Sequence, residues 1–158
     1  MTSRRVAGRK AQNKGKGFET FLERACWAQG IVAIRIPDGC RKINGGFGRL
    51  PKLLPVKSPF DWILGFEGRV VCLDTKNLGD KRLAYSALKQ HQVQALWSLG
   101  KHCVAGYLVF FNELGMLSFF NGATLKKLCS GDSLGIEDAQ ITQRIDSIDL
   151  RELFKLRS

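Results

Sequence analysis

Two aspartates and a lysine near the middle of the chain are the residues whose types and spacing could do chemistry. Asp61 lies thirteen positions before Asp74, and Lys76 follows Asp74 after a single threonine. Carboxylates that meet in space are hard oxygen ligands for a divalent cation such as Mg²⁺, and an ammonium beside them can stabilise negative charge on a phosphate. If the three side chains converge, they predict a metal site able to act on a phosphate ester.

The local sequence predicts a β-hairpin that brings these side chains together. Phe60 to Phe66 and Arg69 to Asp74 are rich in β-branched and aromatic residues, and Glu67-Gly68 between them can form a turn. A two-residue turn at that point places Asp61 directly opposite Asp74, with Cβ atoms roughly 4.5–5.5 Å apart. Because side chains alternate along a strand, the lysine two positions later lies on the same face.

Like charges placed opposite each other across two strands repel, so this hairpin needs a compensating group. A surface ion pair between Lys76 and one aspartate contributes little free energy and leaves the second aspartate unexplained. A divalent cation held by two carboxylates, a backbone carbonyl and water removes the repulsion, and it also binds substrate phosphates. The metal interpretation is therefore favoured over the simple ion pair.

The elements around the hairpin predict an α/β domain with a mixed sheet. Apolar residues in Gly17 to Gln29 recur at helical spacing, and Ile31 to Ile36 is typical of a strand. A second helix from Ala87 to Leu99, with Ser86 as its N-cap, precedes Cys103 to Phe111, which is apolar enough for a strand buried on both faces. A loop is expected at Leu78 to Leu83, and a turn at Asn112 to Gly115 should lead into a strand at Met116 to Phe120. Two short helices are expected at Thr124 to Cys129 and at Asp149 to Leu156.

Composition places the chain among globular proteins of one domain. Its 158 residues are 44% hydrophobic and 25% charged, which suits a single buried core. The longest apolar run, Cys103 to Phe111, is too short to cross a bilayer, and Met1 to Lys16 lacks the apolar segment of a secretory signal. The five cysteines are scattered without metal-site spacing, so reduced thiols and a cytoplasmic location are expected.

The charge of the chain favours nucleic acid as a partner. Lysine and arginine number 25 against 14 aspartates and glutamates, and the formal net charge of +11 attracts phosphate backbones. No amphipathic basic helix with a bulky apolar face is evident, so a membrane partner is not expected. The basic residues concentrate in an N-terminal arm, residues 1–16, and in a Gly- and Pro-rich loop, residues 37–59: Arg4, Arg5, Arg9, Lys10, Lys14 and Lys16, then Arg41, Lys42, Arg49, Lys52 and Lys57.

The combined motifs resemble the PD-(D/E)xK nuclease superfamily, and within it the RecU-type Holliday junction resolvases. Asp61, followed by Asp74-Thr75-Lys76 on the next strand, resembles the D...(D/E)xK signature. The segment KGKGFETFLERA resembles the acidic helix of these resolvases, with Glu19 at its active-site position. The run LKQHQVQAL resembles the helix after their catalytic strand, with Gln92 at the position of its glutamine. The resemblance covers the chain from about Lys14 to Phe120 and implies a restriction-endonuclease-like mixed β-sheet flanked by helices, within a single nuclease domain over residues 17–158.

The resemblance implies metal-dependent hydrolysis of DNA. Asp61, Asp74 and the Thr75 carbonyl would hold Mg²⁺, for which Mn²⁺ could substitute, and Lys76 would orient the attacking water or stabilise the transition state. Two features depart from the family. Resolvases of this group usually have glutamate where this chain has Asp74, and small hydroxyl residues where it has Ser58-Pro59-Phe60. These differences affect the expected substrate preference more than the expected chemistry.

Two polar residues on the predicted helices complete the expected catalytic set. Gln92 interrupts the apolar stripe of the second helix, so it needs a hydrogen-bond partner, either a neighbouring backbone group or a group of the active site. The resemblance implies that Gln92 positions water or phosphate. Glu19 lies at the edge of the first helix's apolar stripe, and Glu23 one turn later could take the same part. The resemblance favours Glu19.

The segment from Pro37 to Pro59 resembles the stalk that RecU-type proteins insert into the centre of a junction. Its basic residues would contact phosphates and its aromatic residue would stack on exposed bases: Arg41, Lys42, Arg49 and Lys52, with Phe47. Symmetric resolution needs two cuts, so the resemblance also implies a homodimer with two sites related by a twofold axis. A bacterial protein, or a phage protein acting in a bacterial host, is expected.

Two other functions fit the same residues. One is a nuclease of the same superfamily that acts on other DNA, in repair or restriction. The other is a non-catalytic DNA-binding protein in which the paired aspartates have no role. Comparing cleavage of a four-way junction with cleavage of a linear duplex distinguishes a resolvase from a nuclease that acts on other DNA. Binding without Mg²⁺-dependent cutting would identify a non-catalytic DNA-binding protein.

Overall fold

A computed structural model describes residues 17–43 and 52–155 and places a six-stranded mixed sheet at the centre of the protein. The order across the sheet is β1-β4-β5-β7-β8-β10, with β5 and β7 parallel and the other neighbours antiparallel. The expected α/β class with a mixed sheet is confirmed. These strands are β1 (Val32–Arg35), β4 (Trp62–Phe66), β5 (Arg69–Leu78), β7 (Val104–Phe111), β8 (Met116–Asn121) and β10 (Ile141–Arg144).

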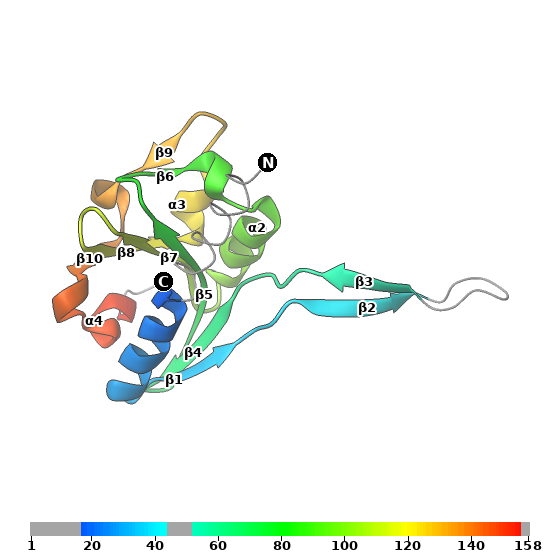
Figure 1. The fold of residues 1–158 in the computed structure, drawn as a ribbon, viewed down its shortest axis with the longest axis horizontal. Helices are drawn as coiled ribbons and strands as arrows, with labels where there is room; N and C mark the ends of the chain where they lie inside the picture. Colours follow the sequence, from blue (N-terminus) through cyan, green and yellow to red (C-terminus); the bar gives the residue numbers. More distant parts are fainter. Residues whose placement is uncertain (1–16, 44–51, 156–158) are drawn as a thin grey trace, which may run out of the picture.

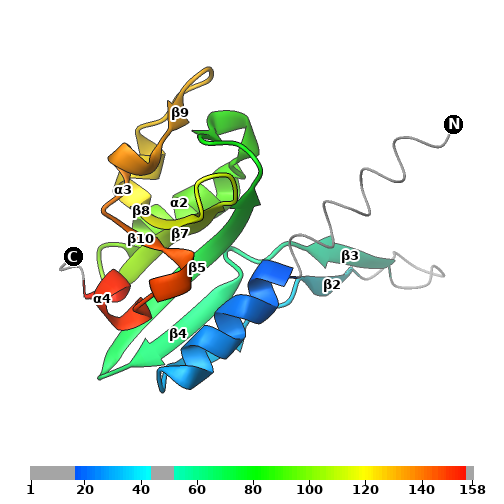
Figure 2. The same cartoon turned by 60° about the vertical axis from the view of Figure 1, so that its left-hand side comes forward.

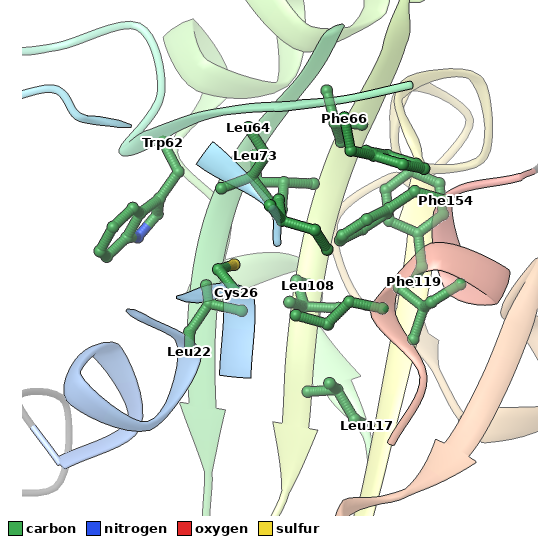
Figure 3. Close-up of a cluster of buried hydrophobic side chains, with 14 of the residues drawn as sticks. Leu22, Cys26, Trp62, Leu64, Phe66, Leu73, Leu108, Leu117, Phe119 and Phe154 are labelled. Atoms are coloured by element: carbon green, nitrogen blue, oxygen red, sulfur yellow. The ribbon is translucent and has the colours of Figure 1, made fainter. Parts of the chain in front are cut away.

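Helices cover both faces of this sheet, so the domain has three layers (Figure 1). The helix over residues 17–28 and α4 (Leu150–Phe154) pack on one face, where Leu22, Trp62 and Phe154 belong to one buried cluster (Figure 3). Helices α2 (Gln90–Leu99) and α3 (Gly122–Lys126) pack on the other face. Figure 2 shows the N-terminal helix in front of the sheet, with α2 behind it.

The hairpin between β4 and β5 has the register predicted from its turn. Trp62 pairs with Leu73 and Phe66 with Arg69, which leaves Glu67 and Gly68 as the two turn residues. Their φ angles of 50° and 72° are both positive, as a type I′ turn requires. Strand β5 continues to Leu78 instead of ending at Asp74, because its second half pairs in parallel with β7.

The basic insertion is a two-stranded ribbon rather than the expected loop. Strands β2 (Gly39–Ile43) and β3 (Lys52–Val56) pair antiparallel and project away from the body of the domain (Figure 1). Pro55 is tolerated there because both strands of a two-stranded ribbon are edge strands. At the base of the ribbon, the backbone N–H of Ser58 donates to Asp38 Oδ1 at 2.8 Å and ties the two ends together.

The expected start of α2 at Ala87, capped by Ser86, is wrong. Residues Tyr85–Ala87 form a separate 3₁₀ turn, and Leu88 and Lys89 that follow are extended, so the α-helix begins only at Gln90. Leu88 is buried in the core beneath α2, and this packing overrides the local N-cap signal. The expected end of the helix before Gly100 is confirmed.

The C-terminal part contains more structure than the local patterns predict. The two short helices are α3, capped by the Asn121 side chain, and α4, capped by Asp149. Strand β10 and the two-stranded pair of β6 (Leu83–Ala84) with β9 (Ser133–Leu134) were not expected. A short 3₁₀ turn at Ile136–Asp138 connects β9 to β10, and another at Ile145–Ser147 connects β10 to α4. Among the described residues, no helix is long and apolar enough to cross a membrane.

Candidate active site

Asp74 lies in the middle of β5 with its side chain on the α2 face of the sheet. Leu73 belongs to the cluster on the opposite face, and strand alternation therefore turns Asp74 towards α2. Its side chain has no solvent exposure. Burial raises the pKa of Asp74 to about 7, the ammonium of Lys76 lowers it, and the neighbouring carboxyl of Asp61 raises it. A carboxylate held in this way needs positive charge beside it in order to ionise.

Asp61 reaches Asp74 through a distortion of the strand pair. The N–H of Asp61 donates to the carbonyl of Leu73 at 2.9 Å, while Trp62 is the register partner of that same leucine. Two residues therefore oppose one, as in a β-bulge, a feature common beside active sites because it re-aims a side chain. The expectation that Asp61 lies directly opposite Asp74 is therefore wrong by one residue, because Asp61 bonds to Leu73 and not to Asp74. The two carboxyls still interact, and the Thr75 N–H lies 3.5 Å from Asp61 Oδ2.

Lys76 supplies the positive charge. Its Nζ lies 2.8 Å from Asp74 Oδ2, and its side chain is 18% exposed, so the pair is largely shielded from water. The same Nζ lies 5.3 Å from the centre of the Tyr107 ring, within the range of a cation–π contact. Lys76 is thus held between a carboxylate and an aromatic face at the edge of the site.

Gln92 binds Asp74 directly from the facing helix. It is 2% exposed, and its Nε2 donates to Asp74 Oδ1 at 2.8 Å. The partner that the sequence required is therefore the candidate metal ligand and not a backbone group. The hydroxyl of Tyr107 donates to Gln92 Oε1 at 3.1 Å, which completes a buried chain of three side chains. Sequence reasoning missed Tyr107, whose phenol in the apolar run from Cys103 to Phe111 was the available signal.

Glu19 lies on the N-terminal helix and pairs with a different residue. Its Oε2 is 2.7 Å from Arg35 Nη2 on β1. Within residues 17–43 and 52–155, no three histidine, cysteine, aspartate or glutamate side chains gather closely enough to hold a metal, so Glu19 does not join Asp61 and Asp74 in such a group. Glu23, the alternative, is exposed to solvent.

The two carboxylates fit a hard divalent cation. Asp74 Oδ2 is buried and, apart from the ammonium of Lys76, has no hydrogen-bond partner in the described part of the chain. A second carboxyl lies beside it, and the raised pKa of Asp74 shows that its charged form is undercompensated. Oxygen ligands without imidazole or thiolate suit Mg²⁺ or Mn²⁺. Two carboxylates would leave the other positions to a carbonyl, water and substrate.

Few of the expected DNA-binding residues can be placed in detail. Arg41 and Lys42 lie on β2, Lys52 lies on β3, and Lys57 is exposed just after the ribbon. The others lie outside the described residues: Arg4, Arg5, Arg9, Lys10, Lys14, Lys16, Phe47 and Arg49.

Comparison with known proteins supports the fold. No protein-family model matches the chain, and no curated protein matches it. Among solved structures, the chain is similar to Hjc of Archaeoglobus fulgidus, a Holliday junction resolvase from an archaeal hyperthermophile, with a TM-score of 0.53 and 18% sequence identity. The match covers 82% of this chain and 95% of that one. The similarity confirms the expected restriction-endonuclease-like arrangement of a mixed sheet between helices.

Proposed function

We propose that this protein is a structure-selective endonuclease that cleaves four-way DNA junctions by metal-dependent hydrolysis of phosphodiester bonds. The observation that carries the proposal is the meeting of Asp61, Asp74 and Lys76 on the hairpin of a fold shared with a Holliday junction resolvase. The D...(D/E)xK resemblance supports the same chemistry, and the RecU-type resemblance supports the substrate.

The residues of the hairpin would divide the chemistry between them. Asp61, Asp74 and the Thr75 carbonyl would hold Mg²⁺, or Mn²⁺ in its place. When bound, the ion supplies Lewis acidity, which lowers the pKa of water and neutralises charge on the phosphate. The ammonium of Lys76, already beside Asp74, would orient the attacking water or stabilise negative charge that develops on the phosphate oxygens. Glu19 could join the site only by leaving its ion pair with Arg35.

The ribbon and the net charge of +11 support DNA as the substrate. A projecting basic ribbon can reach phosphates that a flat surface cannot. The RecU-type resemblance of this segment supports the proposal that it acts as a stalk in the junction. Arg41, Lys42 and Lys52 are the proposed contacts on the described strands, together with Lys57 at the base. Recognition of the branch point by this ribbon would give the junction preference.

We further propose that two copies act together, because symmetric resolution needs two cuts. An exposed apolar face supports the homodimer. Val32 and Ile34 on β1 and Val70 on β5 are 64%, 52% and 49% exposed. Their registers with β4 put all three on the α2 face of the sheet, at the end that α2 leaves uncovered. Exposed apolar area of this kind commonly marks a protein interface.

The test is cleavage of an immobile four-way junction compared with a linear duplex of the same sequence, with Mg²⁺ and with EDTA. Cleavage of the junction alone, and only with Mg²⁺, is expected. Asp74→Asn and Lys76→Ala should each lower the cleavage rate by about a thousandfold or more while junction binding stays largely intact. Lys81→Ala, at an exposed lysine, is the matched control and should cleave normally.

The other outcomes identify the rival functions. Equal cleavage of junction and duplex would favour a nuclease that acts on other DNA. Salt-sensitive binding without any Mg²⁺-dependent cutting would favour a non-catalytic DNA-binding protein. Retained cleavage by both site variants would remove the hairpin from the chemistry.

A further inference from the structure

We propose that Tyr107 is a positioning residue, which holds the Gln92 amide in the one orientation that presents its NH₂ group to Asp74. This inference rests on the proposed function of the site. Tyr107 lies on β7 as the direct register partner of Asp74, and its hydroxyl donates to Gln92 Oε1 at 3.1 Å. Gln92 Nε2 in turn donates to Asp74 Oδ1 at 2.8 Å.

The hydrogen-bonding groups of the Gln92 amide determine its orientation between Tyr107 and Asp74. A carboxylate only accepts hydrogen bonds, whereas an amide has a donating NH₂ end and an accepting carbonyl end. If the amide of Gln92 turned over, two acceptor oxygens would face each other at Asp74. The hydroxyl of Tyr107 satisfies the carbonyl end and so favours the productive orientation over the reversed one.

The phenol must be the donor in this hydrogen bond, because the carbonyl oxygen of Gln92 can only accept. The orientation of the Gln92 amide is therefore held from both ends.

Burial makes each of these hydrogen bonds difficult to replace. Tyr107 and Asp74 have no exposure, and Gln92 has 2%, so water has little access to either end of the amide. A buried acceptor that loses its partner costs more free energy than an exposed one, and hydrogen bonds in a chain reinforce one another. Without the Tyr107 hydroxyl, Gln92 Oε1 would be left unsatisfied and the amide would be held only by its hydrogen bond to Asp74.

As a consequence, the two carboxylate oxygens of Asp74 have different partners in the site. Gln92 donates to Asp74 Oδ1, so a cation would bind at Oδ2, which otherwise meets only the ammonium of Lys76, together with the carboxyl of Asp61. Gln92 thereby acts on the metal ligand itself, whereas the resemblance implied a contact with water or phosphate. The ring of Tyr107 adds a second constraint, because the ammonium of Lys76 lies over it.

A double-mutant cycle tests whether Tyr107 acts through Gln92. Tyr107→Phe keeps the ring and removes only the hydroxyl. It should lower kcat for junction cleavage about tenfold, or about 1.4 kcal/mol in the barrier. The Kd for the junction should be unchanged. In a Gln92→Ala background the same change should have no further effect on kcat, because its target is gone. Tyr85→Phe, at the chain's other tyrosine, should leave kcat unchanged.

An unchanged kcat in Tyr107→Phe, or a full tenfold loss in the Gln92→Ala background, would overturn the proposal while junction cleavage by the natural protein still stood. A second readout needs no activity. The side-chain NH₂ protons of Gln92, identified by NMR through their loss in Gln92→Ala, should be protected from exchange with water and should lose protection in Tyr107→Phe. Equal protection in both proteins would overturn the proposal even if the natural protein cleaved no DNA.

Discussion

Asp74 has a fully buried side chain that meets an ammonium, an amide and a second carboxyl. Burial alone makes its ionised form costly, and the carboxyl of Asp61 adds to that cost. Lys76 offsets part of it but leaves the pKa of Asp74 near 7. A bound divalent cation would favour the ionised form, so metal affinity and protonation at this residue should be linked.

This linkage predicts a pH-dependent stability in the absence of metal. Because the pKa of Asp74 is raised from 3.8 to about 7, folding favours its protonated form. The contribution of protonated Asp74 to the free energy of unfolding is therefore complete below pH 3.8 and is lost as the pH rises through about 7. The Tm of the natural protein minus that of Asp74→Asn, measured in EDTA by circular dichroism, should therefore fall between about pH 4 and about pH 8.

Saturating Mg²⁺ should raise the Tm of the natural protein most at the alkaline end of this range, where no proton competes for Asp74. Asp74→Asn should show little of this increase. A Tm difference that does not change with pH in EDTA would contradict burial as the cause of the pKa shift. An equal response of both proteins to Mg²⁺ would place the cation elsewhere.

At the scale of elements, the β4–β5 hairpin determines where the acidic side chains lie. Its type I′ turn sets the register from Phe66 to Trp62, and the bulge at Asp61 then directs the second carboxyl towards Asp74. Glu67 occupies a positive φ of 50° in this turn, a conformation that costs free energy for a residue other than glycine, asparagine or aspartate. The turn residue is thus less suited to its conformation than the Asn-Gly pair that hairpins prefer.

Replacement of Glu67 by asparagine should stabilise the protein, by about 0.5–1 kcal/mol, because asparagine tolerates the left-handed region. Glu67→Ala is the matched control: both changes remove the exposed contact with Arg151, for which the closest atoms are 3.6 Å apart, but alanine gains nothing in this conformation. In urea unfolding, the free energy of unfolding should be highest for Glu67→Asn, intermediate for the natural protein and lowest for Glu67→Ala. A variant Glu67→Asn no more stable than Glu67→Ala would show that the backbone strain at this turn is negligible.

At the scale of the whole molecule, the basic ribbon is expected to determine DNA affinity. Each phosphate contact made by a lysine or arginine adds about 0.9 to the slope of log K against log salt. Replacing Arg41 and Lys42 by glutamine should therefore weaken junction binding and reduce that slope by about 2. Arg144→Gln, at the far edge of the sheet where Arg144 pairs with Asp146, should leave the slope unchanged. An unchanged slope in the double variant would show that the ribbon does not contact phosphates.

The exposed apolar face formed by Val32, Ile34 and Val70 predicts that two chains assemble into a dimer. The natural protein should have twice its chain mass of 17.6 kDa by light scattering, and Ile34→Glu should reduce it to one chain without a large change in Tm, because this side chain is already half exposed. Trp27→Glu, at a residue 86% exposed on the helix of the opposite face, is the control and should remain dimeric. A natural protein of single-chain mass at micromolar concentration would contradict the dimer.

The amino-acid sequence by itself determined those features that depend on near neighbours. The period of apolar residues identified the N-terminal helix, the hairpin and β7, and the Glu67-Gly68 turn determined the register of β4 with β5. Alternation along β5 placed Asp74 and Lys76 on one face. The buried position of Gln92 and its need for a partner also followed from helical spacing.

Only the tertiary structure decided which distant groups meet. The parallel pairing of β5 with β7 puts Tyr107 opposite Asp74, and the docking of α2 brings Gln92 between them. The burial of Leu88 places the start of α2 later than the local N-cap signal predicts. Glu19 pairs with Arg35 on β1, a contact that the sequence of the N-terminal helix does not predict. Such contacts join residues far apart in the chain, and local propensities contain no information about the free energy gained when whole faces pack together.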